Sequence, residues 1–291
     1  MPNTFCRHLL YALTAAAGVL AGYQQPPLAS SGTAAPLRFA VIGDSGTGGR
    51  PQYEVAAVMA ASHSHLPFEF VIMLGDNLYS GWSQKAVVER FELPYKLLLD
   101  AGVQFYASLG NHDDGAERSY APFHMSGERY YTFTRSNVAF FALDSNYVDR
   151  SQLEWLEREL QASKAAWKIA FFHHPLYSSA ARHGSEQDLR RVLEPLLIRY
   201  GVQVVFSGHD HVYERIRPQH GITYFVCGSS GQLRSGNLAK GSALTAAGFD
   251  QDQAFMIIDV ADDALQFQAI SRASAIVDFG EITSKAAVLG P

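Results

Sequence analysis

Cysteine is scarce in this sequence, with two residues in 291. Cys6 lies in an N-terminal segment that we expect to be removed, so Cys227 is the single cysteine of the remaining chain. A lone cysteine excludes an internal disulfide, and the fold must therefore depend on its core and on any metal that it binds. Because Cys227 lies in a strand-like run, we expect it to be a small buried apolar residue.

An excess of positive charge is also absent. The chain has 23 Lys and Arg against 28 Asp and Glu, which gives a formal charge of -5. This balance predicts no broad basic surface, so we do not expect nucleic acid or anionic lipid to be the main partner. The 47% of hydrophobic and 18% of charged residues are typical of a soluble globular protein. Any phosphate must then be bound by local groups.

Long hydrophobic runs are missing as well. The apolar run at 9–22 follows Arg7, which is the pattern of an export signal. The run is shorter than a helix normally needs to span a membrane. We expect an exported monomer, periplasmic or secreted, with no stable membrane span after signal removal; an uncleaved N-terminal anchor is the minor alternative. The expected organisation is a signal peptide at 1–28, a linker at 29–36, one domain at 37–285 and a tail at 286–291.

From Leu37 onward, strand-like and helix-like patterns alternate. The first part reads as a right-handed parallel βαβαβ unit, followed by a long loop at 111–129 and an antiparallel hairpin. The predicted order is strand 37–42, helix 51–61, strand 68–74, helix 85–100, strand 103–109, hairpin strands 129–134 and 138–143, helix 151–162, strand 167–172, helix 185–200 and strand 202–207. Ser151 and Ser185 are the predicted N-caps of the last two helices.

After His211 the helical pattern stops. Antiparallel strands are predicted over 213–217, 221–227, 254–260, 264–270 and 275–279. The weakly patterned segment 228–249 is expected to be a mobile loop near the site. The fold class is therefore α/β (α+β), with two facing mixed β-sheets between helices; the first half of the chain forms one sheet and the second half adds strands to the facing sheet.

Five strands end abruptly in polar residues. Because the carboxyl ends of such strands form the ligand-binding edge of an open α/β sheet, these side chains are expected to meet. The five ends are Gly43-Asp44-Ser45-Gly46, Gly75-Asp76-Asn77-Leu78-Tyr79, Gly110-Asn111-His112-Asp113, Phe172-His173-His174-Pro175 and Gly208-His209-Asp210-His211.

Taken singly, these residues have ordinary structural roles. Asp44 and Asp76 suit turns or helix caps, Asn111 suits a left-handed turn, and Tyr79 suits a packed aromatic position. His209 and His211 are more specific, because residues i and i+2 of an extended segment share one face and two such imidazoles suit a metal. Two Asp, one Asn, one Tyr and three His arriving at one edge together suit two metal ions with a shared carboxylate.

In this order the five segments resemble the motifs of calcineurin-like metallophosphoesterases. Tyr79, within Gly-Asp-Asn-Leu-Tyr, narrows the resemblance to the purple, tartrate-resistant acid phosphatases. The resemblance implies that one metal takes Asp44, Tyr79 and His211, that the other takes Asn111, His173 and His209, and that Asp76 bridges both. Phenolate is a hard, strongly donating anion, which favours Fe(III) in the first position, with divalent Fe, Zn or Mn in the second.

Three further histidines need an interpretation. The ligand in this family lies two residues before a proline, which selects His173; His174 is then expected to point elsewhere, because neighbours in a strand alternate faces. His112 and His183 match the substrate-contacting histidines of the family, which implies a catalytic role for both.

The expected function is that of a binuclear-metal acid phosphatase, which hydrolyses small phosphomonoesters by direct attack of metal-bound hydroxide. One alternative is a phosphodiesterase or nucleotide hydrolase on the same fold, but diesterase relatives generally lack the tyrosine at position 79. A second alternative is a catalytically silent exported metal-binding protein. That interpretation predicts the loss of His112 and His183, which are both present.

Overall fold

The computed structural model describes residues 36–79 and 81–284. The expected signal peptide at 1–28, the linker apart from Pro36, and the expected tail at 286–291 lie outside these ranges. Within them, no helix combines the length and the apolar character needed to cross a membrane.

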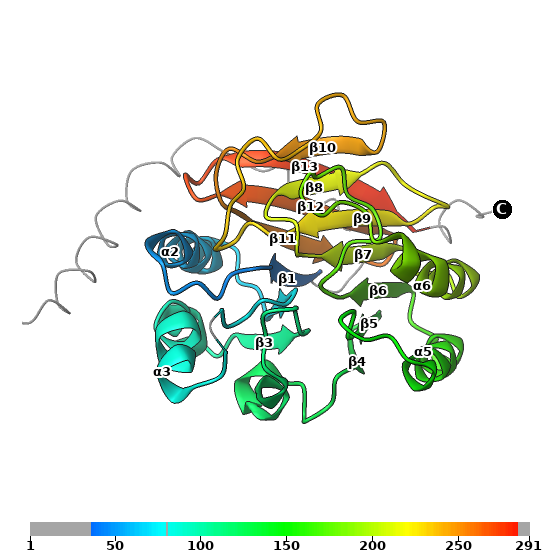
Figure 1. Cartoon of the computed structure of the whole chain (residues 1–291), viewed down its shortest axis with the longest axis horizontal. Coiled ribbons are helices and arrows are strands. Elements are labelled where there is room, and N and C mark those ends of the chain that lie inside the picture. The colour runs from blue at the N-terminus through cyan, green and yellow to red at the C-terminus, as the bar shows by residue number, and fades with distance from the viewer. Residues whose placement is uncertain (1–35, 80, 285–291) are drawn as a thin grey trace, which may run out of the picture.

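The described residues form a six-stranded and a seven-stranded sheet that face each other (Figure 1). The first sheet has the order β13-β12-β11-β1-β2-β3, with the bounds β1 (Leu37–Ile42), β2 (Phe70–Met73), β3 (Gln104–Ala107), β11 (Ala254–Val260), β12 (Ala264–Ser271) and β13 (Ile276–Thr283). The second has the order β10-β8-β9-β7-β6-β5-β4, with the bounds β4 (Tyr131–Arg135), β5 (Val138–Ala142), β6 (Trp167–Phe171), β7 (Val204–Ser207), β8 (Tyr213–Ile216), β9 (Thr223–Cys227) and β10 (Thr245–Phe249).

The predicted parallel unit is confirmed, because β1 pairs with β2 and β2 with β3, both parallel. The predicted hairpin of β4 and β5 is antiparallel, as expected. The expected division of the chain between the sheets is wrong, however. The hairpin starts the second sheet, where β5 pairs parallel with β6, and the C-terminal β11 pairs antiparallel with β1. The N-terminal unit grows only from β1 towards β3, which leaves the other edge of β1 for β11.

Helices cover the outer face of each sheet, so that α2 and α3 lie on one side of the molecule and α5 and α6 on the other (Figure 1). Their bounds are α2 (Arg50–His65), α3 (Gln84–Val87), α4 (Lys96–Asp100), α5 (Arg150–Ala162) and α6 (Gln187–Arg199). Between the sheets lies an aromatic core. The ring of Phe39 packs edge-on against the rings of Phe140 and Phe206, with ring centroids 5.3 Å and 6.3 Å apart. This core holds the two sheets together, so that their strand ends line one edge.

The single helix predicted over 85–100 is interrupted. Helix α3 passes into a π-helical turn, η1 (Val88–Glu92), and α4 begins only after Pro94. Proline lacks the N–H that a continuous helix requires at this point, which explains the break. The loop at 111–129 is long, as expected, but it contains two short 3-10 turns, η2 (Gly115–Ser119) and η3 (Ala121–Phe123).

Both predicted N-caps are wrong. Helix α5 is capped by Asp149, whose side chain accepts a hydrogen bond from Gln152 N at 2.8 Å, so Ser151 lies inside the first turn. Helix α6 follows Glu186, which has no side-chain cap hydrogen bond. The Ser185 hydroxyl is bonded to Ser178 instead, where it accepts from the backbone N and donates to the carbonyl. Aspartate and serine are comparable caps, so sequence does not separate neighbouring candidates.

Candidate metal centre

Asp44 and Asp76 occupy equivalent turns directly after β1 and β2. Both have a φ of 52°, in the left-handed region that aspartate tolerates better than most residues. A Cβ at Gly110 would lie 2.2 Å from Asp76 Oδ1, and one at Gly208 would lie 2.5 Å from Asp44 Oδ2. These glycines therefore let neighbouring loops close over two carboxylates that are 0% and 1% exposed.

The first group of expected ligands is Asp44, Tyr79 and His211. The Tyr79 hydroxyl lies 3.4 Å from Asp44 Oδ1 and 3.3 Å from His211 Nε2, and these last two atoms are 3.4 Å apart. Three ligand atoms thus converge from the ends of β1, β2 and β7. The other oxygen of Asp44 accepts a hydrogen bond from His209 N at 2.9 Å, which fixes the carboxylate in place.

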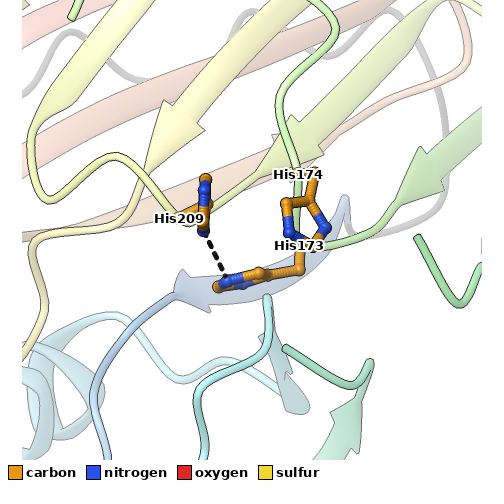
Figure 2. Close-up of side chains that lie close together, drawn as sticks. All are labelled: His173, His174 and His209. Atoms are coloured by element: carbon orange, nitrogen blue, oxygen red, sulfur yellow. Dashed lines mark hydrogen bonds between the residues drawn. The ribbon is translucent and has the colours of Figure 1, made fainter. Parts of the chain in front are cut away.

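The second group is His173, Asn111 and His209, from the ends of β6, β3 and β7. His173 Nε2 lies 2.9 Å from Asn111 Oδ1 and 3.1 Å from His209 Nδ1. Asn111 Oδ1 is also 3.0 Å from His209 Nδ1. Figure 2 shows the two imidazoles converging, with the dashed line marking their contact.

Asp76 lies between the two groups. Its Oδ1 is 3.5 Å from His173 Nε2, and Asp44, Asp76 and His173 offer ligand atoms that all lie within 4.8 Å of one another. Towards the first group, burial and the charges of Asp44 and Asp76 raise the pKa of Tyr79 well above its usual value. The structure therefore brings all seven expected ligands together, with Asp76 close to Asp44 of the first group and to His173 of the second.

The hydrogen-bond acceptors of the second group are arranged to fit a cation. His173 Nδ1 donates to Leu74 O at 2.9 Å, so Nε2 of the neutral ring carries a lone pair. The atoms that face this lone pair, Asn111 Oδ1 and Asp76 Oδ1, are acceptors too. Three lone-pair-bearing atoms that face one another suit a metal ion, which can bind all three, and a bond such as that to Leu74 is the kind of outer contact that orients a metal-binding imidazole.

The electrostatics of the site also fit a bound cation. Burial and the neighbouring Asp76 raise the pKa of Asp44 well above its usual value. Burial and adjacent histidines lower the pKa of His173 and bring that of His209 to about 2, while burial and Arg234 bring that of His211 to about 4. The imidazoles are therefore neutral and free to bind metal. In the described part of the chain, no lysine or arginine forms an ion pair with Asp44 or Asp76.

His174 does not point away from the site, contrary to the prediction. Its ring lies 4.9 Å from that of His173 and 4.4 Å from that of His209, and the three form a second candidate metal-binding cluster (Figure 2). Strand β6 ends at Phe171, so the alternation of faces no longer applies two residues later. Ser145 fixes His174 by accepting from its backbone N at 3.0 Å and lying 2.9 Å from Nδ1.

The prediction that His209 and His211 point the same way from an extended segment is also wrong. His209 has a φ of 67°, and the backbone turns tightly, with Asp210 N donating to Gly208 O at 2.8 Å. As a result the two imidazoles join different groups, His209 the second and His211 the first.

The two expected catalytic histidines are exposed beside the ligand groups, and we call the solvent-facing side on which they lie the mouth of the site. His112 is beside the first group, with its ring 5.1 Å from that of Tyr79 and its backbone N donating to Asp76 Oδ1 at 3.0 Å. The His183 ring lies 4.1 Å from that of His209, beside the second group. The structure therefore places one histidine next to each ligand group.

Two further aspartates support the site, the half-buried Asp113 and the buried Asp210, although the sequence pattern gave them no role. Asp113 accepts from Gly110 N and from the Asn77 amide, both at 2.8 Å, and so ties the loops after β2 and β3 together. Asp210 accepts from the Ser178 hydroxyl at 2.7 Å and from Gly184 N at 3.2 Å, which anchors the loop carrying His183. Both aspartates lie next to motif residues in the sequence, and this position could have indicated that they support the site.

Comparisons with known proteins agree with this geometry. Residues 37–213 match the family model described as calcineurin-like phosphoesterase. The chain is 28% identical over 244 residues to tartrate-resistant acid phosphatase type 5 of Oryctolagus cuniculus, which covers 69% of this chain and 74% of the relative. It is 29% identical over 231 residues to purple acid phosphatase 7 of Arabidopsis thaliana, which covers 67% of this chain and 70% of the relative.

Solved structures share the fold at lower identity. Purple acid phosphatase PPD1 from yellow lupin seeds has a TM-score of 0.75 and 16% identity over 89% of this chain and 56% of that one. GAP50 of Plasmodium, described as the anchor in the inner membrane complex, has a TM-score of 0.74 and 21% identity. The match covers 87% of this chain and 90% of that one. With the ligand groups at the strand ends, these matches show that the chain belongs to the calcineurin-like phosphoesterase family, as a metallophosphoesterase related to the purple acid phosphatases.

Proposed function

We propose that this protein is a binuclear-metal acid phosphatase that hydrolyses small phosphomonoesters. The observation that carries the proposal is the convergence of seven donor residues into two groups that share Asp76, with the phenol of Tyr79 in the first group. The relatives named as acid phosphatases support the class of reaction.

In this proposal Asp44, Tyr79 and His211 hold the first metal, and Asn111, His173 and His209 hold the second. Burial and the neighbouring carboxylates raise the pKa of Tyr79, so only a strong cation displaces the phenol proton. A trivalent ion such as Fe(III) therefore suits the first position. The amide and imidazoles of the second group suit divalent Fe, Zn or Mn. When bound, such a pair neutralises phosphoryl oxygens and activates the attacking water.

His112 and His183 act directly on the substrate in the proposed reaction. Both are exposed at the mouth, one beside each ligand group, so their ring N–H groups can reach a phosphate held there. Water forms the new bond to phosphorus and releases one proton to solvent as the bond to the leaving alkoxide breaks, and one imidazolium gives its proton to that alkoxide. The other histidine donates a hydrogen bond to a phosphoryl oxygen as negative charge develops.

The experiment that tests this proposal compares paired aryl phosphate mono- and diesters as substrates of the metal-loaded protein. The proposal expects a higher kcat/KM for the monoester, with an optimum in acid. Hydrolysis of the diester or of nucleotides alone would replace it with the phosphodiesterase or nucleotide hydrolase alternative. If the metal-loaded protein hydrolyses none of these esters, the alternative of a catalytically silent metal-binding protein is favoured.

We also propose that the protein is exported and acts as a monomer. Support comes from Arg7 followed by the apolar run at 9–22, a charge and hydropathy pattern typical of a cleaved signal. Mass spectrometry of the protein recovered outside the cytoplasm is expected to show a chain that starts between residues 21 and 35. An unprocessed chain in the membrane fraction would indicate an anchor instead.

A further inference from the structure

Arg234 is a cation beside the metal centre that lacks a partner in the described part of the chain. Its Nη1 atom is buried and has no hydrogen-bond acceptor, and none of the ion pairs between described residues includes it. Burying a charged donor without an acceptor costs free energy, so such groups in folded proteins normally have a hydrogen-bond partner from the protein, from water or from a bound molecule. No residue of the first or second group neutralises this guanidinium.

The backbone fixes Arg234 against the first ligand group. Its N donates to His211 O at 2.9 Å, and Gln232 N donates to Asp44 O at 3.1 Å. This approach requires glycine at 231, where a Cβ would lie 2.3 Å from Ser45 O. The segment that carries the arginine therefore lies directly on the turns that hold Asp44 and His211.

Arg234 adds a fixed positive charge next to the first ligand group, because its backbone is bonded directly to His211. The chain as a whole is acidic, with a charge of -5, so this local cation is not part of a general basic surface.

We propose that Arg234 binds the third non-bridging oxygen of a phosphomonoester and thereby selects monoesters over diesters. A monoester has three non-bridging oxygens and carries up to two negative charges, whereas a diester has two such oxygens and one charge. A guanidinium matches phosphate oxygens in both charge and planar geometry, and the half-buried side chain of Arg234 leaves part of that guanidinium open to a substrate. This inference rests on the proposed function, because it concerns the same substrate.

The first test is calorimetric binding of inorganic phosphate to the metal-loaded protein, with metal content measured for each variant. Arg234→Gln is expected to weaken the Kd for phosphate about tenfold or more, the usual effect of losing a charged hydrogen bond. The control is Arg217→Gln, which removes an exposed arginine that directly follows β8 and belongs to neither ligand group, and it is expected to leave the Kd unchanged. An unchanged Kd in Arg234→Gln would overturn the inference.

The second test is the ratio of kcat/KM for aryl monoester and diester. Arg234→Gln is expected to lower the monoester value about tenfold while changing the diester value about twofold or less. An equal loss for both esters would overturn the selectivity. If the glutamine variant does not fold, Arg234→Met, which keeps the apolar stem, replaces it. A wild-type protein without monoesterase activity would refute the proposed function, whereas phosphate binding would still test the contact of Arg234.

Discussion

The phenol of Tyr79 faces a carboxylate oxygen of Asp44 and a nitrogen of His211, both within 3.4 Å. Burial and two carboxylates keep the phenol protonated unless a strong cation is present. Packing alone does not explain a hydroxyl that faces these polar atoms at a half-buried position, since phenylalanine would pack there without the cost of desolvating a hydroxyl. Tyr79 therefore carries information about which metal the first group holds.

Tyr79→Phe is expected to abolish the violet absorption of the iron-loaded protein and to weaken iron binding. The reason is that the colour of a tyrosinate–Fe(III) centre requires the phenolate, which phenylalanine cannot supply. The measurement is a visible spectrum with iron analysis of the purified variant. Tyr147→Phe is the matched control, because this exposed tyrosine lies outside both groups. An unchanged spectrum in Tyr79→Phe would contradict the iron assignment.

The double substitution of His112 and His183 by alanine tests the other residues of the mouth. We expect kcat for an aryl monoester to fall by about 10²–10⁴-fold, the range for losing general acid catalysis, with metal content unchanged. His220→Ala is the control, because His220 is exposed at the turn before β9 and belongs to neither ligand group. Wild-type turnover in the metal-loaded double variant would show that these histidines are not catalytic.

At the scale of elements, the loop at 178–184 depends on two buried acids, one from β8 and one from the turn after β7. Glu214 of β8 is fully buried and accepts from Ser179 N at 2.9 Å and from the Thr245 hydroxyl of β10. Asp210 holds the same loop at Gly184. Strand β10, which the sequence did not predict, therefore helps to position His183.

Thr245→Val tests this arrangement. It leaves a buried carboxylate oxygen of Glu214 without its hydroxyl donor, so we expect the free energy of unfolding to fall by about 1–3 kcal/mol. We also expect kcat to fall, because the loop carrying His183 becomes less well held. Urea unfolding and steady-state kinetics measure the two effects. Thr134→Val, at an exposed position on the edge strand β4, is expected to stay within about 0.5 kcal/mol of wild type. Equal behaviour of the two variants would contradict the role of Thr245.

At the scale of the whole molecule, the features predictable from sequence were those coded locally. Buried apolar runs such as 68–74 predicted the strands, and the polar residues at the ends of these runs predicted the site. The pairing of β1 with β11 was not predictable, since it joins segments more than 200 residues apart, and local pattern does not specify such partners. Arg234 was missed for the same reason, because a lone arginine in a weakly patterned segment gains its meaning only from its contact with His211.

Removing the metals is expected to lower the stability of the whole fold. Asp44 and Asp76 are buried close together at the junction of loops from both sheets, and a bound cation offsets their repulsion. Ligand bound at about 1,000 times its Kd stabilises by about 4 kcal/mol, so chelation should lower Tm by several degrees. Differential scanning calorimetry before and after chelation, and after re-addition of metal, measures this shift. A Tm that does not respond would mean that the folded protein does not depend on metal.

The central claim, that two metal ions joined by Asp76 form the catalytic centre, is tested most directly by counting metal ions per chain in the active protein. Elemental analysis would be paired with monoesterase turnover as metal is removed and restored. The predicted result is two ions per chain, with activity that falls as the ions are removed and returns when they are restored. One ion per chain at full activity, or full activity in a metal-free protein, would contradict it.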